Sequence, residues 1–125
     1  GAAKVPPAGG FFQGNTANAN ADYDAGCDLG SQAPGGAPDQ MLKLELPTKK
    51  RVILDMKGSA YNTLLVVRRT TGCPGPEVAM ACAAGYYQDR SFLDLSLDAG
   101  SYYAQVDGYA GYSGQWFLDV FIVDP

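Results

Sequence analysis

The sequence predicts an all-β protein: a jelly-roll-like antiparallel β-sandwich of about eight strands. Glycine and proline supply 16 and 8 of the 125 residues, a level that interrupts helices and provides turns. From residue 40 onward, apolar and polar residues alternate in short runs that turn residues separate. No segment sustains the 3.6-residue period of an amphipathic helix. Hydrophobic residues make up 46% of the chain and charged residues 18%, which is typical of a globular domain.

Each strand is predicted from a local pattern. The adjacent rings of Phe11 and Phe12 suit a short first strand that docks one ring and leaves the other at an edge or interface. The run 62–70 does not alternate, which indicates a central strand covered on both faces or an edge that meets a partner. The run 115–123 is apolar on both faces, which is unusual for a face in solvent. The remaining strands are expected over 41–46, 51–57, 78–83, 91–97 and 101–107.

The length suits one domain. Residues 1–10 are small residues and prolines, so we expect an extended N-terminal arm, either a tether or a segment that lies along the surface. Residues 11–125 are then a single β-sandwich domain, with a long loop rich in Asn, Asp and Gly before residue 40. No apolar run approaches the roughly eighteen residues of a membrane-spanning helix.

Charge and composition exclude several classes of function. Nine basic and thirteen acidic side chains give a net charge of −4, which disfavours nucleic-acid binding. The chain has no histidine, so a Ser-His-Asp triad, a Cys-His pair and His-ligated metal sites are all excluded. Asp94, Asp107 and Asp119 fall on strands, where outward carboxylates that discourage edge pairing explain them as well as a catalytic pair does. We therefore expect no enzyme.

Disulfide chemistry, the low fraction of charged residues and the abundance of Gly, Tyr and Asn together favour an extracellular or cell-surface location. The three cysteines are Cys27, Cys73 and Cys82. The turn between Cys73 and Cys82 suits a disulfide, worth about 2–3 kcal/mol in the chain-entropy model, and two buried free thiols are the alternative. Cys27 is then left over, either free or able to pair with another chain. A zinc site is not expected, because the spacing lacks a CxxC motif.

Two groups of residues are candidate binding sites. The first is a cluster of amide and carboxylate oxygens in a loop that suits calcium, with a solvated loop of Asx turns as the alternative. It comprises Asn18, Asn20, Asp22, Asp24 and Asp28. The second is an aromatic platform for a sugar ring or an extended peptide, with ordinary half-buried edge residues as the alternative. It comprises Tyr86, Tyr87, Tyr109, Tyr112 and Trp116.

Several motifs, in their order along the chain, resemble the bacterial pre-peptidase C-terminal domain family. They are Gly14-Asn15-Thr16, the strand start Pro38-Asp39-Gln40-Met41, the corner Gly58-Ser59-Ala60-Tyr61-Asn62-Thr63, the hairpin Ala99-Gly100-Ser101-Tyr102-Tyr103 with Val106-Asp107-Gly108-Tyr109, and Ser113-Gly114-Gln115-Trp116. The resemblance covers about residues 11–123. It implies a β-sandwich accessory module of the kind appended to secreted proteases and to bacterial cell-surface proteins. Members often carry a second cysteine near Met56, and its absence here leaves Cys27 unpaired.

Two functions from different classes follow. The first is a non-catalytic accessory domain of an exported bacterial protein, which binds a protein or polysaccharide surface or assists secretion. The second is a subunit of a surface assembly or filament, in which copies of the chain contact one another through Phe11, Phe12 and Cys27. Strand addition by residues 9–13 to the open edge of another copy is the mechanism that the second function requires.

Overall fold

The computed structural model describes residues 3–16, 40–57, 63–70, 76–82, 91–108 and 114–125. These residues form nine strands and no helix. Seven of the strands coincide with the predicted ranges to within two residues, β2 contains the predicted Phe11 and Phe12, and β1 lies in the N-terminal arm. They are β1 (Ala3–Lys4), β2 (Gly9–Asn15), β3 (Gln40–Leu46), β4 (Lys50–Asp55), β5 (Thr63–Arg69), β6 (Glu77–Cys82), β7 (Phe92–Leu97), β8 (Gly100–Gly108) and β9 (Gln115–Val123).

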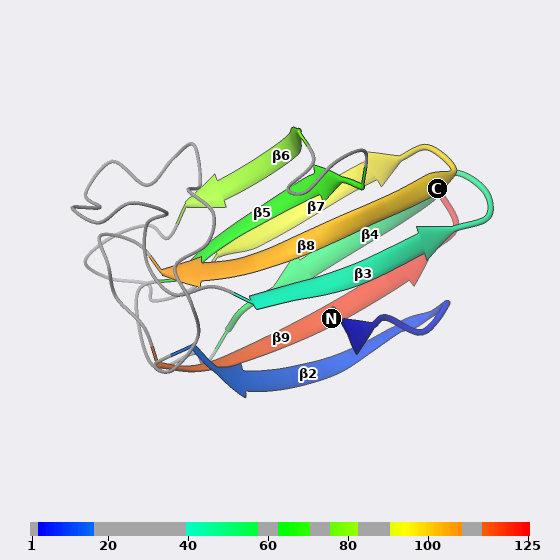
Figure 1. Cartoon of the computed structure of the whole chain (residues 1–125). Coiled ribbons are helices and arrows are strands. Elements are labelled where there is room, and N and C mark those ends of the chain that lie inside the picture. Colours follow the sequence, from blue (N-terminus) through cyan, green and yellow to red (C-terminus); the bar gives the residue numbers. More distant parts are fainter. Residues whose placement is uncertain (1–2, 17–39, 58–62, 71–75, 83–90, 109–113) are drawn as a thin grey trace.

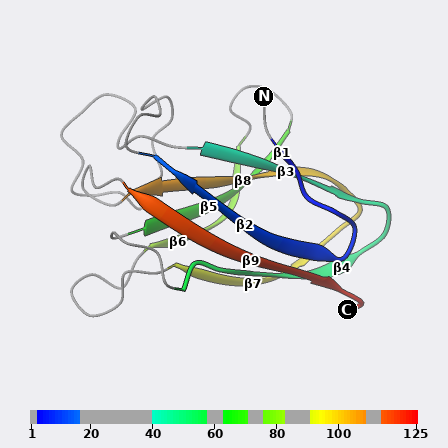
Figure 2. The same cartoon turned by 90° about the horizontal axis from the view of Figure 1, so that it is seen from below.

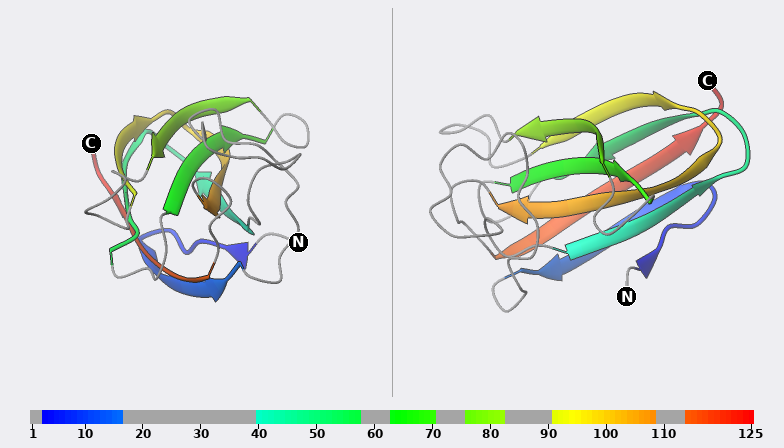
Figure 3. Two further views of the ribbon diagram at one scale, coloured as in Figure 1. Left: turned by 90° about the vertical axis from the view of Figure 1, so that its left-hand side faces the viewer. Right: turned by 45° about the horizontal axis from the view of Figure 1, so that its top comes forward.

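The strands form two sheets packed face to face, as Figures 1 and 3 show. One sheet has the order β2-β9-β4-β7, and the other has the order β1-β3-β8-β5-β6. From β2 to β9 this is the order of a jelly roll, in which two Greek keys share both sheets. All pairings are antiparallel except that of β1 with β3. The predicted fold class is confirmed.

The core lies between the two sheets and contains the apolar residues of one parity from each strand. Predicted inward residues such as Val52, Leu54 and Met56 of the β4 segment are fully buried. The turn before β8 also follows from the sequence, because Gly100 has a φ of +151°, a conformation that side chains rarely adopt. The buried cluster otherwise includes Leu42, Leu44, Leu46, Leu65, Val67, Leu93, Leu97, Tyr102, Ala104, Val106, Trp116, Leu118, Val120 and Ile122.

The strand β5 is buried on both faces, which confirms the first of the two predicted environments for its unalternating sequence. Leu65 and Val67 belong to the core between the sheets, whereas Leu64 and Val66 are equally buried on the opposite face. On that face a buried polar chain runs beside them. Arg68 Nε donates to Gln105 Oε1 at 2.7 Å, and Gln105 Nε2 donates to Asp107 Oδ2 at 2.9 Å.

The N-terminal arm, over its described residues, lies along the sandwich and contributes to both sheets. Val5 is buried in the core, and its backbone N–H donates to Lys43 O at 2.8 Å beside β1. The chain then turns at Pro6 and enters β2 at Gly9, which pairs with β9. Gly9 has a φ of +97°, and a Cβ there would meet Val120 O at 2.0 Å, so the strand must start at glycine. Figure 2 shows β2 and β9 side by side.

Candidate functional site

The outer face of the β2-β9-β4-β7 sheet carries an exposed apolar surface, here called the outer face. Among the described residues, four large hydrophobic side chains are exposed, and all four lie on this face. They are Phe11 (56% exposed), Phe92 (48%), Phe121 (50%) and Val123 (44%). They come from three strands, because the register aligns the outward parity of β2, β9 and β7. An exposed apolar group of this kind is typical of an interaction surface rather than of scattered surface residues.

A row of four side chains crosses the centre of the outer face. The register pairs Phe11 with Asp119, Asp119 with Asp55, and Asp55 with Phe92, so two carboxylates lie between two exposed phenyl rings. Like charges directly opposite each other on neighbouring strands are unfavourable. Asp55 Oδ1 accepts a hydrogen bond from Lys57 N at 3.0 Å, but among the described residues no lysine or arginine forms an ion pair with either carboxylate. The centre of the outer face is therefore acidic.

The apolar side chains surround this acidic centre. The rings of Phe11 and Phe117 stack, with their centroids 6.0 Å apart and their planes at 18°. On the other side of the row, Phe121 lies opposite the half-buried Ile53 in the ladder between β9 and β4. This contact positions Phe11 against a neighbouring ring on the outer face.

Ion pairs border the outer face on the β4 side. Arg51 Nε and Nη2 donate to the two carboxylate oxygens of Asp94, at 2.9 and 2.6 Å. These hydrogen bonds hold the pKa of Asp94 below its ordinary value. Lys50 Nζ likewise donates to Asp124 at 2.7 Å and lowers the pKa of that carboxyl. Both pairs are at the surface, where each adds little to stability.

Most of the residues predicted as sites lie outside the described part of the chain. These are Cys27 and Cys73, the loop residues Asn18, Asn20, Asp22, Asp24 and Asp28, and the tyrosines Tyr86, Tyr87, Tyr109 and Tyr112. Cys82 ends β6, where its backbone pairs with Leu64. The disulfide, the calcium loop and the tyrosine platform stay predictions. Within the described residues no three Cys, Asp or Glu side chains gather as metal ligands.

Trp116 is a correction to the predicted aromatic platform. Its ring is only 3% exposed and belongs to the core, because the parity of β9 points it inward. Its Nε1 donates to Gln40 Oε1 at 2.7 Å, and Gly14 gives it room. Trp116 therefore cannot belong to an exposed aromatic platform. The exposed aromatic surface that the structure contains is instead on the opposite parity of the same strand.

Phe11 and Phe12 behave as predicted for a strand with one docked ring. Phe12 packs against the core, and Phe11 points to solvent on the outer face. The sequence identified the apolar second parity of residues 115–123, which holds Phe121 and Val123, but it did not single out Phe92. The available signal for Phe92 was its parity, which it shares with Asp94 and Ser96 and which is opposite to that of the leucines of β7.

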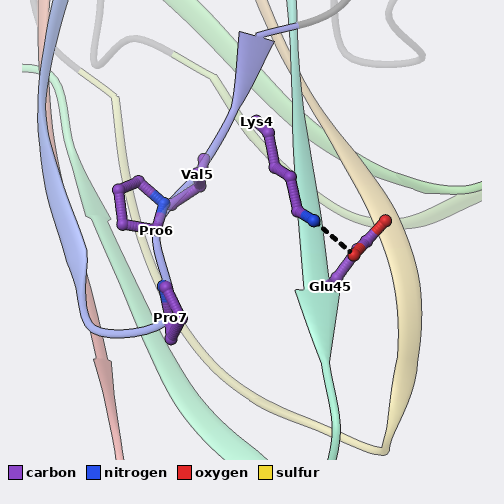
Figure 4. A pocket seen from close by; sticks show the side chains of 5 residues that line it. All are labelled: Lys4, Val5, Pro6, Pro7 and Glu45. Carbon is purple, nitrogen blue, oxygen red and sulfur yellow. Dashed lines mark ion pairs between the residues drawn. The ribbon is translucent and has the colours of Figure 1, made fainter.

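A shallow surface pocket of about 300 Å³ lies beside β1, as Figure 4 shows. Its lining is Lys4, Val5, Pro6, Pro7 and Glu45. Lys4 Nζ and Glu45 Oε2 are 3.0 Å apart across it, and this contact lowers the pKa of Glu45. The two charges neutralise each other, so the pocket offers no unpaired acid or base. No helix in the described residues is long and apolar enough to cross a membrane.

The fold and the outer face together define a class: a two-layer jelly-roll domain with an aromatic sheet face. Comparison with solved structures shows that this fold is similar to that of a pre-peptidase C-terminal domain. The chain is similar to the pre-peptidase C-terminal domain of a collagenase from Bacillus anthracis, with a TM-score of 0.63 and 14% identity over 96% of this chain and 94% of that one. The fold that the sequence motifs implied is therefore confirmed. No family model and no curated protein matches the chain.

Proposed function

We propose that the chain is a non-catalytic accessory domain of an exported bacterial protein, which adheres to a protein or polysaccharide surface through its outer face. One observation carries the proposal: Phe11, Phe92, Phe121 and Val123 are exposed together on one sheet. Removing such a surface from water is favourable by roughly 25 cal/mol per Å² of apolar area. The similarity to a collagenase domain supports an extracellular setting and makes collagen a polymer to test.

The charge of the outer face limits the classes of partner that can bind to it. Asp55 and Asp119 make its centre acidic, while the Arg51–Asp94 pair is neutral overall. An anionic polymer would be repelled from this face, and a neutral or basic one would not. The proposed partner is therefore a protein or an uncharged polysaccharide rather than a nucleic acid.

The proposed role is non-catalytic because the candidate carboxylates do not converge. Asp94 is held by Arg51 and Asp119 stands on the outer face, both in the four-stranded sheet. Asp107 is fully buried on the other sheet, where Gln105 donates to it. Asp107 therefore cannot flank one bond of a substrate together with Asp94 or Asp119, as a paired-carboxylate mechanism requires.

The test is adsorption of the fluorescently labelled chain to insoluble collagen, chitin and cellulose, with DNA-cellulose as the anionic comparison. The double substitution Phe92→Ser and Phe121→Ser should lower adsorption at least about tenfold, because it removes two of the four exposed side chains. Tyr103→Ser, which removes a half-buried ring from the other sheet, is the matched control and should adsorb like the parent. Equal adsorption by all three proteins would refute the outer face as the adhesive surface.

A subunit of a filament is the second candidate, because β2 is an edge strand. Donation of residues 9–13 to another copy, however, requires β2 to leave β9, with which all seven of its residues pair. Deleting residues 1–13 would remove most of a native strand and the buried Val5, so loss of assembly after that deletion would not identify a donated strand. A sharper test of assembly alters only the edge of β2 that faces away from β9.

A further inference from the structure

The four edges of the two sheets differ in how they are protected. The edge strands are β1 and β6 in one sheet and β2 and β7 in the other. An edge strand exposes unpaired backbone N–H and C=O groups, to which any other extended chain can add. Natural proteins discourage this with short strands, charged side chains, proline or bulges.

Three of the edges carry such protection. The strand β1 is two residues long, bears Lys4 and runs into Pro6. The strand β7 carries Asp94, which Arg51 holds beside the edge. The strand β6 follows Pro76 and begins at Glu77, where its pairing with β5 is irregular.

The strand β2 carries none of these features. Its seven residues, Gly-Gly-Phe-Phe-Gln-Gly-Asn, include no charge and no proline. Its register with β9 runs from Gly9 to Asn15 without a bulge. It is the longest of the four edge strands and the only one of them without a charged side chain within its described bounds. Figure 1 shows it along the lower margin of the molecule.

The hydrogen bonds show which backbone groups of β2 face away from the sheet. Ile122 N donates to Ala8 O at 3.2 Å, and Thr16 N donates to Gly114 O at 2.9 Å. Even-numbered residues of β2 therefore point their backbone groups at β9, and odd-numbered residues point theirs outward. The Gly9 N–H is used by Pro6 O at 3.0 Å. Phe11 and Gln13 thus present an N–H and a C=O each at the free edge, and among the described residues no other strand pairs with them there.

We infer that two copies of the chain join through this edge, with β2 antiparallel to β2 about a two-fold axis and Phe11 opposite Gln13 of the second copy. Each of these two pairings forms two backbone hydrogen bonds, as in any hydrogen-bonded antiparallel pair. The two four-stranded sheets become one eight-stranded sheet. The contact is isologous, because each copy contributes the same β2 edge. Once two copies have paired, neither has a free β2 edge, so the assembly stops at a dimer.

A second copy fits this edge for two reasons. Phe11 and Phe11 of the second copy become diagonal neighbours on the outer face, where aromatic rings reach each other, and the two Phe11–Phe117 stacks merge. The charges also permit it. Among the described residues, the nearest carboxylates without an ion pair are Asp119 in each copy, which lie three strand spacings of about 4.8 Å apart, or at least roughly 14 Å. That exceeds the Debye length of about 8 Å at physiological salt, so their repulsion is screened.

The experiment compares the mass in solution of three proteins by light scattering and sedimentation, from about 10 μM to about 1 mM. The parent should approach twice its chain mass of 13.2 kDa. Gln13→Pro removes an outward N–H and no hydrogen bond to β9, so it should stay folded and shift to the mass of one chain. Gln13→Ala keeps that N–H and is the matched control, which should dimerise like the parent. Trp116 fluorescence reports whether each variant retains its core.

Hydrogen exchange supplies a second readout in the parent. The amides of Phe11 and Gln13 should be protected at high concentration and lose that protection on dilution. The amides of Phe12 and Gly14 point at β9 and should stay protected at both. A parent of single-chain mass up to about 1 mM, a folded Gln13→Pro variant as dimeric as the parent, or unprotected Phe11 and Gln13 amides in a dimer would each overturn the inference. If the parent has a mass greater than that of a dimer and Gln13→Pro does not lower that mass, the dimer inference is overturned in favour of a filament. The outcome is independent of adhesion, which the Phe92 and Phe121 variant tests separately.

Discussion

Gly9 shows most clearly how the backbone conformation at one position determines whether that position tolerates substitution. Its φ of +97° places it in the left-handed region, and the position of its missing Cβ coincides with Val120 O. Gly10, one residue later, has only the ring of Phe12 nearby, at 3.6 Å from its ideal Cβ, which is an ordinary contact. The two neighbours therefore differ in tolerance although both are glycines in one strand.

We predict that Gly9→Ala lowers the free energy of unfolding by at least about 2 kcal/mol, through backbone strain and displacement of β2 from β9. Gly10→Ala is the matched control and should change it by less than about 1 kcal/mol. Urea denaturation followed by Trp116 fluorescence measures both. Equal losses in the two variants would contradict the assignment of strain to Gly9.

The surface carboxylates Asp94 and Asp124 have separate cationic partners, which makes their titration testable. Hydrogen bonds from Arg51 lower the pKa of Asp94, and a hydrogen bond from Lys50 lowers the pKa of Asp124. A carboxyl whose pKa is lower in the folded state stabilises the fold above its unfolded pKa of about 3.9. That contribution is lost as the pH falls through the folded pKa.

We predict that Arg51→Met moves the titration midpoint of Asp94 upward toward the ordinary value and leaves that of Asp124 in place. Lys50→Met should do the reverse, since its partner is Asp124. Carboxyl-carbon NMR titration reads each midpoint in the folded protein. If either substitution moved both midpoints equally, a general change in surface charge rather than the two specific pairs would be the cause.

Among the strands, β5 and β4 show how far local pattern predicts environment. In β4 the buried Val52 and Leu54 alternate with the partly exposed Ile53, as the sequence indicates. In β5 the residues from Thr63 to Arg68 are all buried. The strand β5 lies between β8 and β6 in its sheet, and its run of buried residues alternates between the two faces. The unalternating sequence of β5 therefore belongs to a strand with two buried faces.

We predict that Val66→Ala and Val67→Ala each cost about 2 kcal/mol of unfolding free energy, although their side chains point to opposite faces. In β4, by contrast, Val52→Ala should cost about as much, whereas Ile53→Ala should cost under about 1 kcal/mol. Denaturant titration of the four variants compares them. A small loss for Val66→Ala alone would mean that the outward face of β5 is not packed.

For the whole molecule, the surface divides into parts with different expected roles. The outer face offers exposed rings around an acidic centre, the free side of β2 offers unpaired backbone groups, and Phe11 belongs to both. The dimer that we infer would place two outer faces side by side on one continuous sheet. An adhesive surface doubled in this way gains avidity on a polymer without any new contact.

Adhesion and dimerisation are proposed to depend on different strands, so one pair of variants can test the two proposals separately. The Phe92→Ser and Phe121→Ser protein should lose adhesion and keep the mass of the parent, because neither residue lies on β2. Gln13→Pro should become a single chain and keep its adhesive face, so its adsorption should fall only by the loss of avidity. A variant pair that lost both properties together would indicate that adhesion depends on dimerisation.

Much of the fold was determined by local sequence. Alternation in residues 41–46, 91–97 and 115–123 set which side chains point inward, and glycine and proline set where strands end. The adjacent Phe11 and Phe12 likewise predicted one inward and one outward ring, because successive residues of a strand point to opposite faces. These features depend on the backbone period of 2 and on turn chemistry, which are properties of neighbouring residues.

Other features were decided only by the tertiary structure. The burial of Trp116, the meeting of Asp119 with Asp55, and the gathering of Phe11, Phe92 and Phe121 depend on strand order and register, which join residues far apart in the sequence. The local pattern predicts which face of a strand a side chain occupies but not its cross-strand neighbours. It therefore predicted the apolar second face of β9 but not the acidic centre of the outer face. For the same reason β2 could be recognised as an edge strand only after its place beside β9 was known.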